Sequence, residues 1–207
     1  MTRLLLIRHA PTAETGRSLS GRLPGHSLSD EGRIKADEVG GRLAPVALSA
    51  IYSSPLERTT ETAEAIARRQ QKRAARTVRP HDGLLEVDYG DWSGRTLRSL
   101  YRLQAWKGVV TSPSRGQFPR GESLRAARER AVQACEEIAR RHRGHQIGLV
   151  THADIIKAAA SHYLGQPLDL FNRLAVAPAS VTVIDLPEIG PARLITLNSN
   201  GDPTTWQ

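Results

Sequence analysis

Short apolar runs alternate with segments of helical periodicity along this chain. Residues 4–7 and 147–150 are continuously apolar, which is typical of strands covered on both faces of a sheet. Residues 50–53 and the weaker run 77–79 indicate two further strands. This pattern predicts an α/β domain with a largely buried sheet.

Helices are expected between and after these strands. In residues 30–43, Asp30 is placed to cap a helix, and apolar side chains recur at Ile34, Val39 and Leu43. The other expected helices lie at 55–69, 95–106, 122–142 and 153–164. Strands and helices therefore alternate, which supports the α/β class.

The last part of the chain predicts a hairpin. Residues 180–184 and 193–197 have strand patterns and are separated by Pro and Gly residues, which favours an antiparallel pair at one edge of the sheet. That edge could pair with a second copy of the chain in a homodimer, or be covered by residues 201–207. Because no internal repeat or low-complexity linker interrupts the pattern, we expect one domain spanning residues 1–207.

Composition excludes several classes of protein. A chain of 207 residues can bury a sizeable core without disulfides or structural metals, and its single cysteine, Cys135, excludes a disulfide framework. No segment approaches the ~20 apolar residues of a membrane span, and the first residues are too short for a secretory apolar region. We therefore expect a soluble, cytoplasmic protein with no membrane partner.

The formal net charge of +8 suits several anionic partners. Nucleic acid, a membrane surface and small phosphorylated molecules all favour a positive protein. The basic side chains are scattered, and their densest cluster, residues 68–79, contains no aromatic residue of the kind that stacks on single-stranded nucleic acid. We expect no specific nucleic-acid partner.

Two predicted strands each end in a histidine. His9 follows the first apolar run, preceded by Arg8, and His152 follows the later one. Ligands of open α/β sheets bind beyond the carboxyl ends of strands, so both imidazoles are candidates for one site. Arg58 falls in the first turn of a helix, where backbone N–H groups also favour an anion. Two Arg and two His around one point predict a site for a phosphoryl group.

Five sequence blocks, in this order, resemble motifs of the histidine phosphatase superfamily in its phosphoglycerate mutase-like branch. They are residues 8–12, 53–63, 85–94, 121–124 and 150–152. The resemblance extends over most of the chain. It implies a three-layer α/β/α sandwich around a mostly parallel sheet with an antiparallel edge, and an enzyme that needs no metal and no cofactor.

The resemblance also implies catalytic roles. His9 would be the nucleophile, attacking phosphorus and becoming a transient phosphohistidine. A backbone carbonyl bonded to its other ring nitrogen would fix the required tautomer. Arg8, Arg58 and His152 would hold the equatorial phosphoryl oxygens and neutralise the charge that develops on them.

A carboxyl group would act as general acid and then as general base. The resemblance favours Glu86, which would protonate the leaving oxygen and then take a proton from water, while Asp88 is the alternative. The pKa of Glu86 would have to be raised by burial or by a nearby carboxylate such as Asp88. Weaker expectations of contact with substrate oxygens fall on Thr12, Thr15, Ser20 and Gly21.

Departures from the family pattern bear on the substrate. Ala10 replaces a usual Gly and would crowd the phosphate if it needed a positive φ, and Ala153 and Asp154 replace a Gly pair. These changes favour a divergent phosphatase acting on a small phosphorylated metabolite over a phosphoglycerate mutase. A mutase, and a non-catalytic protein that binds phosphate or nucleic acid, remain the alternatives. Specificity is expected to lie in residues 102–120, as a lid.

Overall fold

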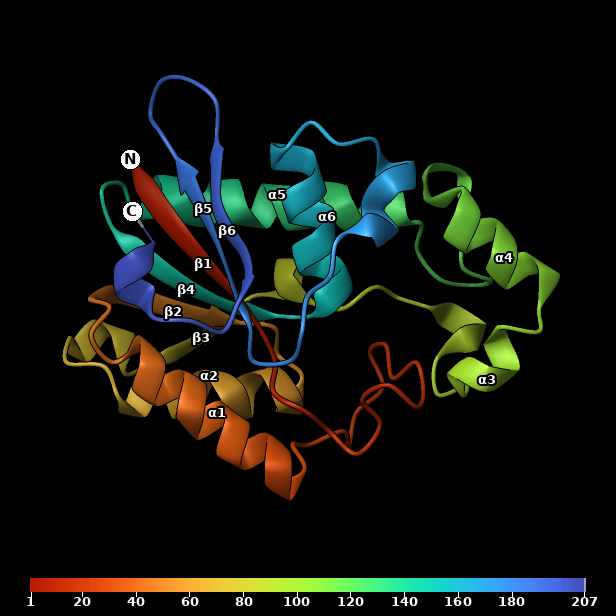
Figure 1. The fold of residues 1–207 in the computed structure, drawn as a ribbon, viewed down its shortest axis with the longest axis horizontal. Helices are drawn as coiled ribbons and strands as arrows, with labels where there is room; N and C mark the ends of the chain where they lie inside the picture. Colours follow the sequence, from red (N-terminus) through yellow and green to blue (C-terminus); the bar gives the residue numbers. More distant parts are fainter. Residues whose placement is uncertain (207) are drawn as a thin grey trace.

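Six strands form one sheet in the computed structural model, which describes residues 1–206 (Figure 1). In chain order they are β1 (Thr2–Arg8), β2 (Leu48–Ser53), β3 (Val78–Pro80), β4 (Gln146–Thr151), β5 (Val181–Leu186) and β6 (Arg193–Ser199). Across the sheet the order is β3-β2-β4-β1-β5-β6. The first four of these are parallel, whereas β5 and β6 are antiparallel to their neighbours. The predicted α/β class and the hairpin at one edge are confirmed.

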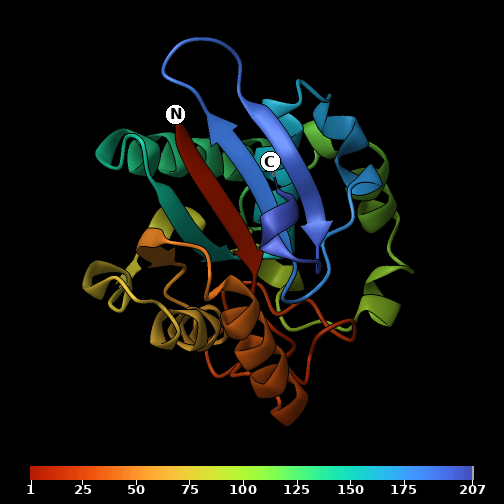
Figure 2. The same ribbon diagram turned by 60° about the vertical axis from the view of Figure 1, so that its left-hand side comes forward.

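Helices cover both faces of the sheet. The helices are α1 (Asp30–Leu43), α2 (Glu57–Arg68), α3 (Leu97–Leu100), α4 (Gln104–Thr111), α5 (Leu124–Arg141) and α6 (Ala153–Tyr163). Figures 1 and 2 show α1 and α2 on one face and α5 and α6 on the other. This arrangement is the three-layer α/β/α sandwich implied by the resemblance.

The continuous apolar run of β1 is explained by its central position. Leu5 and Ile7 pack in the apolar cluster shared with α1 and α2, while Leu4 and Leu6 pack in the cluster shared with α5 and α6. Because successive side chains point to opposite faces and both faces are covered, all four are fully buried.

Helix α1 has the predicted bounds but differs in two details. Ser29, rather than Asp30, is the N-cap, and its Oγ accepts a hydrogen bond from the Gly32 N–H at 3.0 Å. The prediction that Ile34 faces the core is wrong, because its side chain is 60% exposed whereas Val39 is buried. At about 100° per residue, Ile34 lies roughly 140° around the helix from Val39.

The single helix expected at 95–106 is instead two short helices, α3 and α4. Apolar side chains recur every third residue and all contribute to one cluster; they are Leu97, Leu100, Leu103, Trp106 and Val109. A straight α-helix turns about 100° per residue, so this spacing would spread the five side chains around its axis. The break between the helices allows all five to face the same cluster.

The final described residues pack on the sheet. Trp206 is buried in the cluster beneath α1, and its main-chain oxygen accepts a hydrogen bond from Arg3 Nη1 at 2.7 Å. Gln207, the last residue of the tail considered above, lies outside the described residues. Among residues 1–206, no helix has the length and apolar character needed to cross a bilayer.

Candidate active site

His9 and His152 meet where two neighbouring parallel strands end. Strands β1 and β4 are in register with Arg8 opposite Thr151, so the next residue of each strand carries one of the two imidazoles. The His9 N–H donates to the Thr151 carbonyl oxygen at 2.9 Å, and the two ring centroids are 5.3 Å apart. The structure thus brings together the two histidines that the sequence singled out.

The His9 ring is held in one orientation. Its Nδ1 lies 2.8 Å from the Ala10 carbonyl oxygen, so a neutral ring donates its Nδ1 hydrogen there and keeps a free lone pair on Nε2. Burial, followed by the positive charge of Arg58, lowers the pKa of His9 to about 3 although the Ala10 hydrogen bond opposes the shift. The imidazole is therefore neutral near pH 7.

Alanine at position 10 does not strain the backbone. The described non-glycine residues with positive φ are Arg120, Ala179 and Asn198, so Ala10 does not adopt the conformation that would have required glycine. Its N–H donates to Thr62 Oγ1 at 3.0 Å, and its side chain is fully buried. The chain therefore accommodates alanine beside the site at no conformational cost.

Two arginines point donors into the same region. Arg58 lies in the first turn of α2, is almost fully buried, and donates through Nη2 to the Gly21 carbonyl oxygen at 2.6 Å. Arg8 donates through Nη1 to the Val176 carbonyl oxygen at 2.7 Å. Burial lowers the pKa of both guanidiniums from their ordinary values, although neighbouring acidic groups oppose this. Arg58 Nη1 and Arg8 Nε are buried without a hydrogen-bond partner among the described residues.

His152 contributes a third unpartnered nitrogen. It is fully buried at the N-cap position of α6, and its Nε2 lies 3.0 Å from Ser54 Oγ. Its Nδ1 has no hydrogen-bond partner in the described chain and lies 3.9 Å from Glu86 Oε2. When the Ser54 hydroxyl donates to Nε2, Nδ1 carries the hydrogen and becomes a donor to a ligand.

Glu86, and not Asp88, faces these groups. Its side chain lines the same hollow as His9, with Oε1 accepting from the Val87 N–H at 2.9 Å, whereas Asp88 Oδ1 accepts from the Gly90 N–H at 3.0 Å within its own loop. Burial, and then the charge of Asp154, raise the pKa of Glu86 to about 7. The nearby carboxylate expected to be Asp88 is therefore Asp154.

The site is a hollow of about 230 Å³ beyond the carboxyl ends of β1 and β4. Its wall includes every predicted substrate-contacting residue: Thr12, Thr15, Ser20 and Gly21. In the described chain, residues 102–120 contribute nothing to this wall. Phe118 and Trp106 pack instead against Trp92, and Phe118 also packs against the ring of Tyr89, which lines the hollow. The segment predicted as a lid therefore packs, through Phe118, against a residue of the wall and does not itself line the hollow.

Gly21 shapes one side of this hollow. Its φ of +55° is in the left-handed region, and a Cβ there would come within 2.9 Å of Ser93 Oγ and 3.1 Å of Tyr89 Cδ2. Its carbonyl oxygen is the acceptor for Arg58 Nη2. A glycine at this position therefore permits a close approach that also orients the second arginine.

Sequence reasoning missed a charged network behind Glu86. Arg22 Nε donates to the Glu86 carbonyl oxygen at 2.8 Å, and Arg22 Nη2 donates to Glu122 Oε1, also at 2.8 Å. Arg130 donates to the same Glu122 oxygen at 2.7 Å and to the Leu85 carbonyl oxygen at 2.8 Å. Glu122, treated above only as part of a motif, holds two arginines that bind the main chain around Glu86.

Tyr89 and Asp154 form a second connection to the Glu86 loop. The Tyr89 hydroxyl donates to Asp154 Oδ2 at 2.7 Å, and Lys157 Nζ lies 2.9 Å from Asp154 Oδ1. The sequence showed Asp154 as a departure beside His152, but its pairing with a tyrosine 65 positions earlier depends on the fold.

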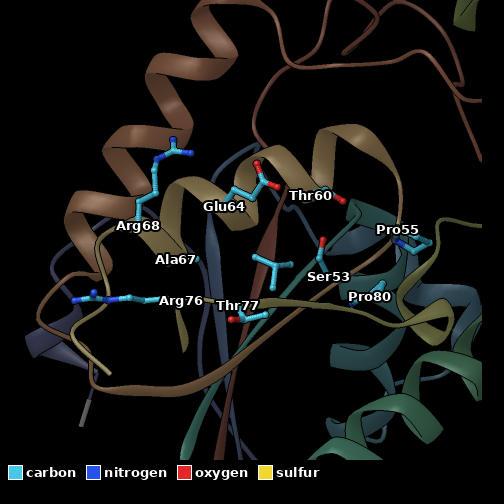
Figure 3. Close-up of a pocket in the computed structure, with 10 residues that line it drawn as sticks. Ser53, Pro55, Thr60, Glu64, Ala67, Arg68, Arg76, Thr77 and Pro80 are labelled. Carbon is cyan, nitrogen blue, oxygen red and sulfur yellow. The ribbon is translucent and has the colours of Figure 1, made fainter. Parts of the chain in front are cut away.

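A larger hollow lies away from this site. It has a volume of about 670 Å³ and separates α2 from β3, with Thr60, Glu64 and Arg68 on one side and Thr77 and Pro80 on the other (Figure 3). In the described structure it contains none of the predicted catalytic or substrate-contacting residues. Within residues 1–206, no group of three or more His, Cys, Asp or Glu side chains is arranged to hold a metal ion.

The fold and these residues define a class of protein. The model of the histidine phosphatase superfamily (branch 1) matches residues 4–199, and the chain belongs to this family. It is an enzyme of the phosphatase or phosphomutase type.

Relatives in this family have related activities. The chain is 31% identical to phosphoserine phosphatase 1 of Hydrogenobacter thermophilus, over 91% of this chain and 88% of that protein. It is 30% identical to the 2,3-bisphosphoglycerate-dependent phosphoglycerate mutase of Thermoplasma acidophilum, over 94% of this chain and 91% of that one. Both a phosphatase and a mutase thus align with this chain over most of its length.

Solved structures agree with the fold. The structure of Bacillus stearothermophilus YhfR has a TM-score of 0.87 to this chain at 28% identity, with all of both chains covered. A mutant phosphoserine phosphatase from Entamoeba histolytica, in complex with phosphoserine, has a TM-score of 0.83 at 25% identity, covering 96% of this chain and 98% of that one. The resemblance stated from the motifs is confirmed.

Proposed function

We propose that this protein is a metal-independent phosphomonoesterase that hydrolyses a small phosphorylated metabolite through a phosphohistidine intermediate. The observation that carries the proposal is the set of three buried nitrogens without partners, on Arg8, Arg58 and His152, around the neutral ring of His9. Buried donors are normally hydrogen-bonded, so an unpartnered set is a cradle for an anion.

In the first step, His9 Nε2 attacks phosphorus in line with the ester bond. The N–P bond forms as the P–O ester bond breaks, and the leaving oxygen takes the proton of Glu86. The raised pKa of Glu86, about 7, keeps this proton available near neutral pH. The fixed Nδ1 hydrogen bond to Ala10 leaves Nε2 as the attacking atom.

In the second step, water attacks the phosphohistidine. Glu86, now a carboxylate, accepts a proton from this water as the new P–O bond forms and the N–P bond breaks. The products are the free alcohol and inorganic phosphate, and both His9 and Glu86 return to their starting protonation states. Charge on the transferred group is neutralised in both steps by Arg8 and Arg58, whose hydrogen bonds to main-chain carbonyl oxygens fix them in advance.

The test is the fate of the phosphoryl group. His9→Ala should lower the turnover of p-nitrophenyl phosphate by roughly a thousandfold or more, because the residue removed forms the covalent intermediate. Quenching the native enzyme in alkaline detergent during turnover of radiolabelled phosphomonoester should trap phosphate on His9 that is stable in base and released by acid. Full activity in His9→Ala, or no labelled histidine in active native protein, would contradict the mechanism.

A matched control uses the exposed His162 of α6. His162→Ala removes an imidazole from the same fold and should retain both turnover and labelling. A phosphomutase would share the first step but pass the phosphoryl group to a substrate hydroxyl, as the Thermoplasma acidophilum relative's name indicates. Release of inorganic phosphate from 3-phosphoglycerate or another ester supports the phosphatase, and accumulation of an isomeric ester supports the mutase.

A further inference from the structure

The wall of the active-site hollow is unevenly charged. The Lys and Arg side chains among its described residues are two, Arg8 and Arg58, whereas three side chains are acidic: Glu14, Glu86 and Asp154. A dianionic phosphoryl group needs both arginines. No Lys or Arg of the described wall is then left to pair with a second anionic group on the same substrate.

Asp154 is the acidic residue held firmly in its charged form. Burial alone would raise its pKa, but Lys157 and the Tyr89 hydrogen bond lower the pKa of this carboxyl below its ordinary value. Lys157 does not line the hollow; its Nζ lies 4.1 Å from the centre of the Phe171 ring. A ligand in the hollow therefore meets the carboxylate of Asp154 rather than the ammonium that balances it.

Asp154 lies on the side of the leaving group. Glu86 protonates the leaving oxygen in the proposed reaction, so the alcohol portion of the substrate must lie beside Glu86. Tyr89, three residues further along that loop, binds Asp154 directly at 2.7 Å and lines the same hollow. The leaving alcohol must therefore occupy space bordered by Glu86, Tyr89 and Asp154.

Given the phosphatase reaction proposed above, we propose that Asp154 is a specificity-determining residue that selects phosphomonoesters whose leaving alcohol is neutral or carries an ammonium group. Esters with a carboxylate or a second phosphate near the ester oxygen are disfavoured. An anion placed there would face the Asp154 carboxylate, and like charges repel. An ammonium group would instead gain an ion pair.

This selectivity also bears on the mutase alternative. A phosphoglycerate mutase handles a leaving group that carries a carboxylate and, in its bisphosphorylated form, a second phosphate. The hollow offers an aspartate near that group in place of an arginine or lysine. Rejection by charge is a form of specificity that depends on a repulsive contact rather than on added affinity.

The test compares two small esters of similar size whose leaving alcohols carry opposite charges. Phosphoethanolamine carries an ammonium group two carbons from the ester oxygen, and 2-phosphoglycolate carries a carboxylate at the equivalent place. Each is measured as a competitive inhibitor of p-nitrophenyl phosphate turnover, which yields an affinity whether or not the compound is hydrolysed. The native enzyme should bind phosphoethanolamine more tightly, and Asp154→Asn should reduce this preference about tenfold or more.

The ratio of the two affinities is the decisive quantity, because general damage to the site affects both compounds alike. Asn keeps an oxygen to accept the Tyr89 hydrogen bond, and Asp154→Ser provides a second variant of smaller size. Glu64→Gln is the matched control, since it removes one exposed negative charge from the wall of the other hollow (Figure 3). It should leave the ratio unchanged.

Two results would overturn the assignment of Asp154: a native enzyme that binds 2-phosphoglycolate as tightly as phosphoethanolamine, or a preference that persists in both variants. The native order of affinities tests the idea even if neither variant folds. Failure of the proposed function appears differently, as absence of His9-dependent turnover of p-nitrophenyl phosphate, whose aryl group carries neither a carboxylate, a second phosphate nor an ammonium group.

Discussion

Arg22 Nε lies 2.8 Å from the carbonyl oxygen of Glu86, so a single guanidinium joins the loop that contains Gly21 to the loop that contains the proposed proton donor. The same guanidinium binds Glu122, which also accepts from the Asp88 N–H at 2.9 Å. The main chain on both sides of Val87 is thereby fixed. Arg22 and Glu122 are positioning residues, since their side chains bind the backbone of Glu86 and not its carboxyl group.

Loss of this network should impair proton donation selectively. In Arg22→Ala, kcat/KM for phosphoethanolamine should fall about tenfold more than kcat/KM for p-nitrophenyl phosphate, because an alkoxide leaving group needs the proton of Glu86 and p-nitrophenolate does not. The comparison is made by steady-state kinetics on both esters. Arg17→Ala, which removes an exposed arginine of the same loop, should lower neither value by as much. Equal losses on both esters in Arg22→Ala would indicate a purely structural role.

The pH dependence of the first step should follow Glu86. Its pKa is raised to about 7, so the carboxyl group carries its proton below that pH and loses it above. kcat/KM for an alkyl ester should therefore decrease as the pH rises through about 7. The phosphate of such an ester has a second pKa of about 6 and is mostly a dianion in this range, so the substrate does not cause the decrease.

The control for this profile is Glu86→Gln, which cannot donate a proton. Its kcat/KM for the alkyl ester at pH ~6.5 should be about a hundredfold lower than that of the native enzyme, and nearly independent of pH between ~6.5 and ~8.5. If the decrease near pH 7 persists in this variant, another group controls the first step.

Gly21→Ala should damage both stability and catalysis. The new methyl group would overlap Ser93 Oγ and Tyr89 Cδ2 at a positive φ, and the displaced carbonyl oxygen would no longer orient Arg58. We expect a loss of about 1–2 kcal/mol in the free energy of unfolding, measured in urea, and a raised KM. Gly25→Ala is the matched control: φ is also positive there, but no heavy atom lies within 4 Å of the added Cβ. It should show the backbone cost without the effect on KM.

Helix α1 offers a direct test of its buried face. Val39→Ala should lower the free energy of unfolding by about 2 kcal/mol, because it removes two buried carbons from the apolar cluster that β1 shares with α1 and α2. Ile34→Ala, at a position that the apolar pattern also assigned to the core, should change it by less than about 0.5 kcal/mol, since Ile34 is 60% exposed. Urea denaturation of the two variants decides which face is buried.

The sequence predicted which residues lie together at the ends of the strands, for a physical reason. Strands β1 and β4 are covered on both faces, so their apolar runs are continuous and their ends are marked by the first polar residues, Arg8 and His9 in one case and Thr151 and His152 in the other. Arg58 is likewise placed by the first turn of a helix. Local pattern was sufficient because each of these residues directly adjoins a regular element.

The remaining parts depend on contacts between distant loops. Arg22 and Glu122 are 100 positions apart, and nothing in the periodicity of either segment indicates their ion pair. Helix α1 shows a different reason for error. Ile34 is apolar yet exposed, so apolar character alone wrongly placed its side chain on the buried face of the helix. The break between α3 and α4 lets apolar side chains at every third residue pack against one cluster. The other members of that cluster come from distant segments, so the local sequence does not predict the break.

The division of the site between sheet and loops has a consequence for how the enzyme can change. The phosphoryl cradle belongs to β1, β4 and the start of α2. Backbone hydrogen bonds of the sheet set the positions of β1, of β4 and of β2, the strand that precedes α2. Glu86, Tyr89 and their partners are held by side chains that can be exchanged one at a time. Directed evolution of these loops and of residue 154, with Glu86 retained, should therefore yield catalysts for new esters, while the chemistry of phosphoryl transfer is inherited unchanged.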